Sequence, residues 1–314
     1  MSNSIFEGWI FDHTQYVAVF DTLVDEINRV LKGSTPIIFP LLGDSRTGKT
    51  ALLKDIKAKF ADRLSSSGHN RVIFIAMPST ASNESLAVRI IKSIIGDIPV
   101  KGKSYQILDQ ARQTMEKAGV QVLLIDEANH LVEKRTTERA QSKENRHAAD
   151  WFKELGDLSG ISVVVAGLSH VIRMYADNDQ LENRGLVGAQ IYPYEWNIHE
   201  DRKQYQDTIH AGIDQFKANG WQIEVPLDLV TRVSYLGGGG YIGKARDFLV
   251  RIEVVGGTGK RVDAKLLSRA YKDKYPLDSY GDPLLLKSID DVMLNGAHRK
   301  AIARATHSGR GSKS

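Results

Sequence analysis

The 314-residue sequence contains no cysteine and no apolar run long enough to cross a bilayer. Without cysteine there is no disulfide, no thiolate nucleophile and no cysteine-based zinc or iron–sulfur site, which favours a reducing, cytoplasmic location. A membrane-spanning helix needs about 20 consecutive apolar residues, so we expect no membrane association. We also expect no secretory signal, because no basic segment followed by an apolar one opens the sequence. With 42% hydrophobic and 25% charged residues, the composition is typical of a folded globular protein.

An excess of one charge sign is also missing: 42 basic residues stand against 38 acidic ones, a formal net charge of +4. Such a balance permits nucleic-acid binding without requiring it. The clearest cluster is at the end of the sequence, where residues 295–314 contain five lysines and arginines and no acid. We interpret this segment as a loosely ordered basic arm; the alternative is a merely solvated terminus.

Short β-branched apolar runs alternate with segments of helical periodicity. The runs predict strands over residues 37–42, 72–77, 120–125, 161–166 and 189–194. The intervening periodicity predicts helices over residues 52–64, 84–95, 105–118 and 145–158. This βαβ alternation predicts an α/β fold with a parallel sheet flanked by helices. Pro40 weakens the first strand, because proline cannot donate to a sheet ladder.

The pattern changes after Trp196, where only helices are predicted. They cover residues 200–219, 226–236, 241–254 and 263–274, and another helix is predicted near the start, over 12–31. From this we predict four parts. They are an N-terminal helical segment (1–35), an α/β domain (36–195), a small all-helical lid (196–275) and a C-terminal extension with a basic tail (276–314).

The sharpest motif lies between the first predicted strand and the helix that follows it. It matches G-x-x-x-x-G-K-[ST] at every fixed position and consists of Gly43, Asp44, Ser45, Arg46, Thr47, Gly48, Lys49 and Thr50. In that context the backbone N–H groups of the loop are expected to point at a polyphosphate. Lys49 would reach the β- and γ-phosphates, and Thr50 would offer its hydroxyl to Mg²⁺. The alternative is a glycine-rich turn with no ligand.

An acidic pair, Asp126 and Glu127, directly follows the predicted strand 120–125. A nucleoside triphosphatase needs a carboxylate at such a strand end to hold Mg²⁺, and we assign this role to Asp126. Glu127 is placed to orient or deprotonate the attacking water, which would make the protein an ATPase rather than a nucleotide carrier. Acidic pairs at strand ends are also common surface features, but the P-loop motif makes the catalytic interpretation the stronger one.

The segments GDSRTGKT, VLLIDEANHL, ISVVVAGLSH and GGYIGKARDFL resemble, in order and spacing, the AAA+ ATPases of the TniB/TnsC family, which regulate transposition. The resemblance extends from about Pro36 to Tyr275. It implies a P-loop AAA+ sheet followed by a helical lid, with ATP and Mg²⁺ as cofactors. It also implies self-assembly into a ring or helix on double-stranded DNA, target-site selection, and a transposase and a TniQ-like targeting protein as partners.

The same resemblance suggests candidates for three roles that respond to nucleotide: two sensors and an arginine finger. Ser169 is the candidate for the sensor after the fourth strand, although an N-cap role is equally compatible with its position. Arg184, in the segment QLENR, is the candidate arginine finger that reaches a neighbour's site, the alternative being a solvated surface arginine. In the lid, Gly243 stands where relatives carry a sensor arginine, so Lys244 or Arg246 would substitute; partly buried stems with solvated heads are the alternative.

For DNA, relatives carry a Lys-Gly turn that faces the axis of the oligomer, and Lys101 and Lys103 occupy the corresponding place here. Such loops would follow phosphates without reading bases. The resemblance therefore implies an ATP-dependent transposition regulator that assembles on DNA and directs a transposase, with hydrolysis driving disassembly. Two alternatives stay open: a replication-type AAA+ loader of a helicase or clamp, and a nucleotide-gated signalling switch.

Overall fold

The structure is a computed structural model. It describes residues 4–7, 9, 12–78, 82–132, 138–172, 188–276, 278, 280–283 and 288–308. The chain divides into two compact units. The α/β unit comprises residues 18–44 and 49–191, and the helical unit comprises residues 1–17, 45–48 and 192–314. Because this division rests on compactness alone, the domain boundaries at residues 35, 195 and 275 stay a prediction of the sequence.

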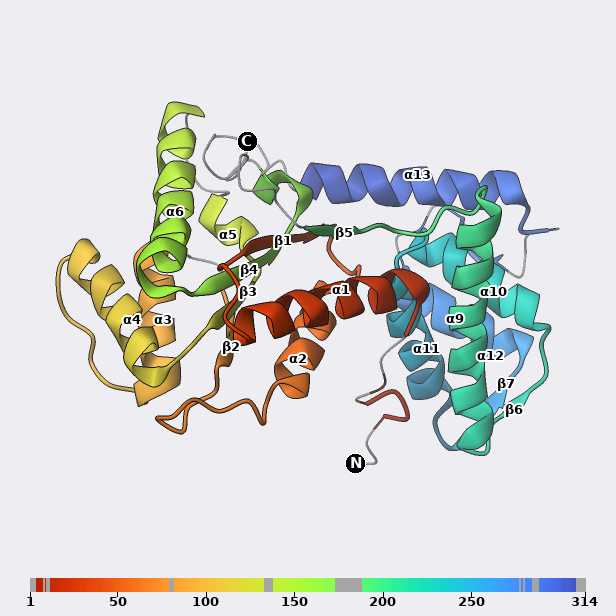
Figure 1. Ribbon diagram of the computed structural model, residues 1–314. Helices are drawn as coiled ribbons and strands as arrows, with labels where there is room; N and C mark the ends of the chain where they lie inside the picture. The colour runs from red at the N-terminus through yellow and green to blue at the C-terminus, as the bar shows by residue number, and fades with distance from the viewer. Residues whose placement is uncertain are drawn as a thin grey trace. The chain divides into compact units, whose positions relative to one another are not determined.

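A five-stranded parallel sheet forms the centre of the α/β unit (Figure 1), as the βαβ alternation predicts. Its order is β2–β3–β4–β1–β5. The strands are β1 (Ile38–Gly43), β2 (Val72–Ala76), β3 (Val122–Asp126), β4 (Ser162–Gly167) and β5 (Ala189–Ile191). Four of them match the predicted ranges closely. β5 is shorter than predicted, and Pro193, which cannot donate to a ladder, lies just beyond its end.

Pro40 lies inside β1, which is a central strand, and the sheet tolerates it for a local reason. β1 pairs with β4 from Ile38 to Leu42, whereas its pairing with β5 begins only at Leu41. On the β5 side, Gly188 lies against the proline: a Cβ added there would be 2.7 Å from Pro40 Cγ. The missing side chain at Gly188 therefore makes room for the ring, and the first predicted strand is confirmed.

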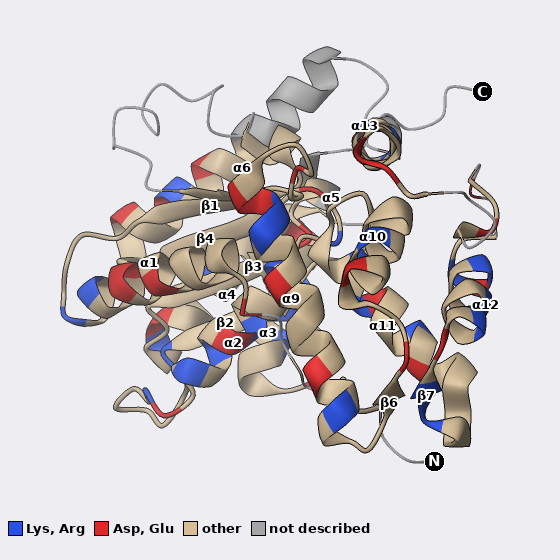
Figure 2. Ribbon diagram, turned by 90° about the vertical axis from the view of Figure 1, so that its right-hand side faces the viewer, with Lys and Arg blue, Asp and Glu red and all other residues tan. Residues whose placement is uncertain are grey.

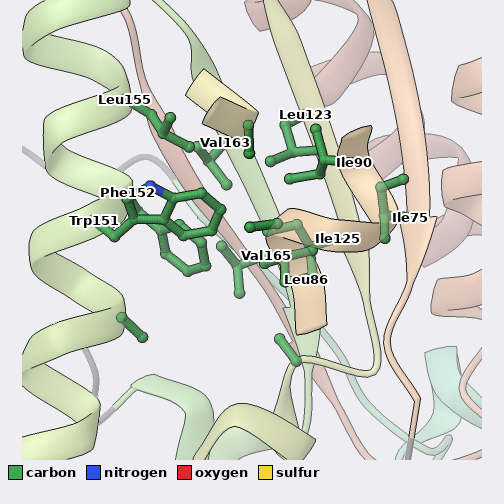
Figure 3. Packing of buried hydrophobic residues seen from close by; sticks show 14 of the residues in the cluster. Ile75, Leu86, Ile90, Leu123, Ile125, Trp151, Phe152, Leu155, Val163 and Val165 are labelled. Atoms are coloured by element: carbon green, nitrogen blue, oxygen red, sulfur yellow. The ribbon is translucent and has the colours of Figure 1, made fainter. Parts of the chain in front are cut away.

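Helices cover both faces of the sheet. They are α1 (Thr14–Leu31), α2 (Lys49–Lys59), α3 (Asn83–Ile95), α4 (Ser104–Ala118), α5 (Asn129–Val132) and α6 (Glu138–Ser159), with a 3₁₀ turn, η1, at Ser169–Ile172. Figure 3 shows aliphatic and aromatic side chains of β3, β4, α3 and α6 packing on one face. Alternate residues of β3 and β4 serve the two faces, which explains why each strand is a continuous apolar run.

The helical unit contains α9 (His199–Ala218), α10 (Leu227–Gly238), α11 (Ile242–Gly256), α12 (Ala264–Lys274) and α13 (Asp291–Ser308). The four predicted helices are confirmed, and charged residues occur along α9 and α12 (Figure 2). The unit also contains a two-stranded parallel sheet, in which β6 (Gln222–Ile223) pairs with β7 (Arg261–Val262), and a 3₁₀ turn, η2 (Gly257–Gly259), just before β7. Segments this short carry no periodic signal, so the expectation of helices alone missed them.

α13 corrects the interpretation of a loosely ordered C-terminal arm. Residues 291–308 form a helix that packs on α10, and Leu294, Ala297, His298 and Ala301 are buried. The remainder of the basic tail, residues 309–314, lies outside the described residues. The sequence misled because, apart from Leu294, these buried residues of α13 are small or polar, and a helix buried largely through alanines has little hydrophobic periodicity.

Candidate nucleotide-binding site

The loop between β1 and α2 has the backbone shape of a phosphate cradle. Gly43 and Gly48 have positive φ angles of 155° and 101°, and Arg46 between them has φ 70°. Successive backbone N–H groups in such conformations form a concave nest for anions, and the N-terminus of α2 follows directly at Lys49. A side chain at Gly48 would be strained by that φ angle alone. The glycines of the motif are therefore required by the loop conformation.

Lys49 lies at the mouth of this loop and is linked to the acidic pair. Its ammonium donates hydrogen bonds to the carbonyl oxygens of Gly43 and Asp44, both at 2.7 Å. Burial lowers the pKa of Lys49, and the negative charges of Glu127, Asp126 and Asp44 act in the opposite direction. The structure thus brings together the loop lysine and the two carboxylates, which lie more than 70 residues away in the sequence.

Asp126 is the last residue of β3 and is buried, with 3% of its surface exposed. Its Oδ1 accepts a hydrogen bond from the backbone N–H of Glu127 at 2.9 Å. Glu127 itself is exposed and has φ 57°, a left-handed conformation that costs roughly 1–3 kcal/mol for a residue other than glycine. The chain therefore turns sharply after β3, so the first carboxylate is held inside and the second faces outward.

These donors suit Mg²⁺ and a triphosphate. Mg²⁺ prefers hard oxygen ligands, and the site offers the buried carboxylate of Asp126 and the exposed hydroxyl of Thr50 in the first turn of α2. Lys49 and the loop N–H groups supply the positive potential that phosphates require. The residues present thus fit the predicted cofactors, with Thr50 and Asp126 as the ligands that would hold the metal. Their individual roles stay predictions.

The tip of the loop, residues 45–48, packs within the helical unit. The carbonyl oxygen of Arg46 accepts a hydrogen bond at 2.9 Å from the backbone N–H of Gly243, in the first turn of α11. A Cβ added to Gly243 would lie 2.7 Å from that oxygen. The Arg46 guanidinium also pairs with Asp247 at 3.1 Å. Sequence reasoning missed this contact; its one signal was a glycine where relatives carry an arginine.

The candidate sensors have other partners in the structure. Ser169 is exposed, opens η1, and its hydroxyl accepts a hydrogen bond from the Gln190 amide at 3.2 Å. The Lys244 ammonium lies over the Tyr241 ring, 4.4 Å from its centroid. Arg246 donates to the carbonyl oxygen of Phe6 at 2.8 Å. Arg184 lies outside the described residues. A sensor or finger role for any of them stays a prediction.

Lys101 and Lys103 lie at the turn between α3 and α4, and both side chains are exposed. Gly102 between them has φ 150°, and the backbone N–H of Lys103 donates to Gln106 Oε1 at 2.8 Å, which caps α4. Tyr105, one residue into α4, is 65% exposed. The turn thus presents two cations and an aromatic ring to solvent.

Comparison with known protein families identifies the family of this chain. A model of the bacterial TniB protein family matches residues 7–187, more than half of the 314 residues. The chain belongs to the TniB family. The matched region contains the P-loop and the Asp126–Glu127 pair, so the predicted family is confirmed. No curated protein matches the chain.

Solved structures show the fold of this TniB-family chain. The ORC1 protein of Aeropyrum pernix in complex with DNA has a TM-score of 0.60 at 16% identity, covering 95% of this chain and 78% of that one. Cdc6p of Pyrobaculum aerophilum has a TM-score of 0.58 at 15% identity, covering 97% and 90%. ORC2 of Aeropyrum pernix, solved as ADPNP–ADP complexes, has a TM-score of 0.55 at 13% identity, covering 98% and 74%. The predicted AAA+ fold is therefore confirmed. None of the described helices is long and apolar enough to span a membrane.

Proposed function

We propose that this TniB-family protein is a cytoplasmic, DNA-associated ATPase that regulates transposition. ATP-bound subunits assemble on double-stranded DNA, the assembly directs a partner transposase to the target site, and hydrolysis dissolves the assembly. The observation that carries this proposal is the electrostatic link between Lys49 and the carboxylates of Asp126 and Glu127, within an AAA+ fold. A nucleotide carrier needs the lysine, whereas hydrolysis also needs the second carboxylate.

Each residue contributes one step. The loop N–H groups and Lys49 bind the β- and γ-phosphates. Asp126 and Thr50 would hold Mg²⁺, which would supply positive charge to neutralise the transferring phosphoryl group. Glu127, the outward-facing carboxylate, accepts a proton from the attacking water or orients it toward the γ-phosphorus. Arg184 from a neighbouring subunit would stabilise the transition-state charge, which makes hydrolysis depend on assembly.

Binding to DNA is assigned to the exposed turn that carries Lys101 and Lys103. Two lysines on each subunit, repeated along an oligomer, would follow the phosphate backbone without reading bases. A structure of the ORC1 protein, which has a similar fold, was determined in complex with DNA. That likeness is compatible with DNA binding by this chain, and the lysine turn supplies a specific surface for it.

The decisive experiment is electron microscopy of the purified protein with linear duplex DNA, with and without a non-hydrolysable ATP analogue, at two salt concentrations. We expect ordered assemblies on DNA only with nucleotide, and fewer at high salt. Lys49→Ala should abolish nucleotide binding and assembly together, and Lys57→Ala, at the far end of α2, is the control. Monomers that ignore both ATP and DNA would refute the proposal.

The partner separates the proposal from its alternatives. A TniB-type regulator should retain a transposase or a TniQ-like protein in a pull-down with nucleotide and DNA, whereas a replication-type loader should retain a helicase or a clamp. A signalling switch would bind ATP and show negligible turnover. Nucleotide-dependent oligomers that do not bind DNA would keep the AAA+ assignment and move the function toward protein remodelling.

A further inference from the structure

The tip of the phosphate loop is fixed at three successive residues within the helical unit. The carbonyl oxygen of Arg46 accepts a hydrogen bond from the backbone N–H of Gly243, and Thr47 is only 2% exposed. Gly48 lies against the Tyr16 ring, since a Cβ added to it would be 3.9 Å from Cδ2 of that ring. The backbone of Arg46 has φ 70°, which is unfavourable for a residue other than glycine. The contacts of Arg46 must therefore offset a conformational cost.

Both the main chain and the side chain of Arg46 are held by one helix, α11. This helix is firmly packed, because its Phe248 and Leu249 are fully buried in the core of the helical unit. Gly243 and Asp247 are four residues apart, so they are neighbours on the helix surface. Gly243 donates to the Arg46 carbonyl oxygen at 2.9 Å, and the Asp247 carboxylate pairs with the Arg46 guanidinium at 3.1 Å. α11 is therefore a support on which the loop tip can be oriented.

The carboxylate of Asp247 is shared by two cations. Its Oδ2 accepts from the Arg46 guanidinium at 3.1 Å and from the ammonium of Lys274, in α12, at 3.0 Å. The side chain of Asp247 is 20% exposed, whereas that of Arg46 is 58% exposed. Asp247 is therefore the fixed member of the pair, and Arg46 is the member that it orients. A free carboxylate near a phosphate site would repel the ligand, and the two cations neutralise this charge.

We propose that Asp247 is a positioning residue for the nucleotide: it holds Arg46, and with it the phosphate loop, in the conformation that binds the triphosphate. The inference rests on the proposed function, because it takes this loop as the ATP site. Close approach of α11 to the loop requires glycine at position 243, since a Cβ there would be 2.7 Å from the Arg46 carbonyl oxygen. The helix therefore reaches the loop with a carboxylate one turn later, and the loop supplies the cation.

An ion pair with one exposed partner contributes little to the stability of a whole protein. The pair between Arg46 and Asp247 acts on a smaller equilibrium, the one between the binding conformation of the loop and other loop conformations. When the binding conformation is populated only in part, the apparent affinity for the ligand falls by that fraction. We therefore expect the loss of Asp247 to weaken nucleotide binding, whatever its effect on the free energy of unfolding.

The test is a double-mutant cycle on the Kd of a non-hydrolysable ATP analogue with Mg²⁺, measured by isothermal titration of the full chain. Asp247→Asn should raise the Kd about fivefold, and Arg46→Gln should also raise it. Because both act through one contact, Arg46→Gln/Asp247→Asn should bind no more weakly than the weaker single variant. Asp247→Glu keeps the charge and should recover most of the affinity. In ATPase assays Asp247→Asn should raise KM far more than it lowers kcat.

The matched control is Asp273→Asn, which removes a carboxylate from another ion pair between α11 and α12, that of Arg251 with Asp273. It should leave the Kd unchanged. The inference is overturned by wild-type affinity in Asp247→Asn, by an equal loss in Asp273→Asn, or by additive losses in Arg46→Gln/Asp247→Asn. In each of these cases, loss of binding in Lys49→Ala would still leave the proposed function standing. A wild-type chain that binds no nucleotide would refute both proposals.

Discussion

The two units of this chain are held together by different kinds of core. In the α/β unit the interior is mostly aliphatic, and its buried aromatics among the described residues, Phe39, Phe60, Trp151 and Phe152, carry no hydroxyl group. The helical unit instead buries many aromatic rings, and several carry hydroxyl groups that must find partners: Tyr194, Tyr205, Tyr235 and Tyr271. The first unit keeps its polar chemistry at strand ends, whereas the second has hydrogen bonds within its interior.

This difference shows where each unit tolerates change. The side chains of the candidate site lie in the first turn of α2, at the end of β3 and in the turn after it, so replacing them leaves the aliphatic packing largely intact. In the helical unit, a buried hydroxyl is both a packing group and a hydrogen-bond partner. Changes in the first unit should therefore alter turnover at constant stability, and changes in the second should alter stability. The following experiments test that contrast, beginning with the largest effect.

Glu127→Gln should lower ATP turnover by at least about 100-fold, because a positioned general base contributes roughly 10²–10⁴-fold. Nucleotide affinity and unfolding free energy should change little, since Glu127 is exposed and the amide has the same shape. The measurements are steady-state phosphate release and binding of a labelled ATP analogue. Full turnover in this variant would remove Glu127 from the mechanism and favour a different base.

Tyr235→Phe should destabilise the protein by about 1–3 kcal/mol, because it leaves buried groups without a partner. The Tyr235 hydroxyl accepts from the backbone N–H of Trp196 at 2.9 Å and donates to the carbonyl oxygen of Tyr194 at 2.7 Å. Urea denaturation measures the change in the free energy of unfolding. The control is Tyr192→Phe, whose ring is 56% exposed and whose loss of a hydroxyl should cost almost nothing. If Tyr235→Phe and Tyr192→Phe had the same free energy of unfolding, the role assigned to the buried hydroxyl would be contradicted.

Gly243→Ala examines the loop tip that packs within the helical unit. A methyl group 2.7 Å from the Arg46 carbonyl oxygen must displace the loop or α11, so we expect nucleotide affinity to fall about tenfold. Gly259→Ala in η2 is the control, since no atom lies within 4 Å of its added Cβ. Isothermal titration with an ATP analogue measures both. Unchanged affinity in Gly243→Ala would show that the loop conformation is independent of α11.

His13 makes the helical unit sensitive to acid. Burial lowers the pKa of His13 to about 4, with its Nδ1 2.7 Å from the Tyr194 hydroxyl and its ring against Tyr16. In the unfolded chain its pKa is about 6.5, so the unfolded state binds the proton first as pH falls. The contribution of neutral His13 to the free energy of unfolding is fully present above pH ~6.5 and is lost as the pH falls toward ~4. At pH 5 the loss is about 1–2 kcal/mol.

The measurement compares urea midpoints at pH 7 and pH 5 in the wild type and in His13→Gln. In His13→Gln the difference between the urea midpoints at pH 7 and pH 5 should be smaller than in the wild type, whatever the stability of the variant at pH 7. His69→Gln serves as the control, because that histidine is exposed and should leave the pH dependence unchanged. If His13→Gln keeps the whole acid effect, other groups are responsible for it.

The sequence predicted the α/β unit well for a physical reason. A strand buried on both faces must be apolar throughout, so runs such as residues 161–166 could be recognised without any knowledge of their neighbours. The P-loop could be recognised because a phosphate cradle needs glycines at fixed positions. The acidic pair could be recognised because a nucleoside triphosphatase needs a carboxylate at the end of a buried strand to hold Mg²⁺.

What the sequence did not predict depends on contacts between distant residues. α13 packs through Ala297 and Ala301 against Gly239, and small residues give no hydropathy signal, so its order was missed. The hydrogen bond from Gly243 to Arg46 joins residues almost 200 positions apart. The conformation of Glu127 was also unforeseen, because a left-handed backbone at a glutamate is set by the surrounding turn rather than by its own preference.

Under the proposed role of Glu127 in hydrolysis, its left-handed backbone implies a trade-off between stability and activity. Only glycine adopts φ 57° without cost, so this chain retains a carboxylate where its fold would favour a residue with no side chain. A homologue that does not hydrolyse nucleotide would lose no activity by replacing this glutamate, and a glycine there would remove the backbone cost. Glycine at this position in a homologue would therefore mark a protein that holds its nucleotide as a permanent structural element.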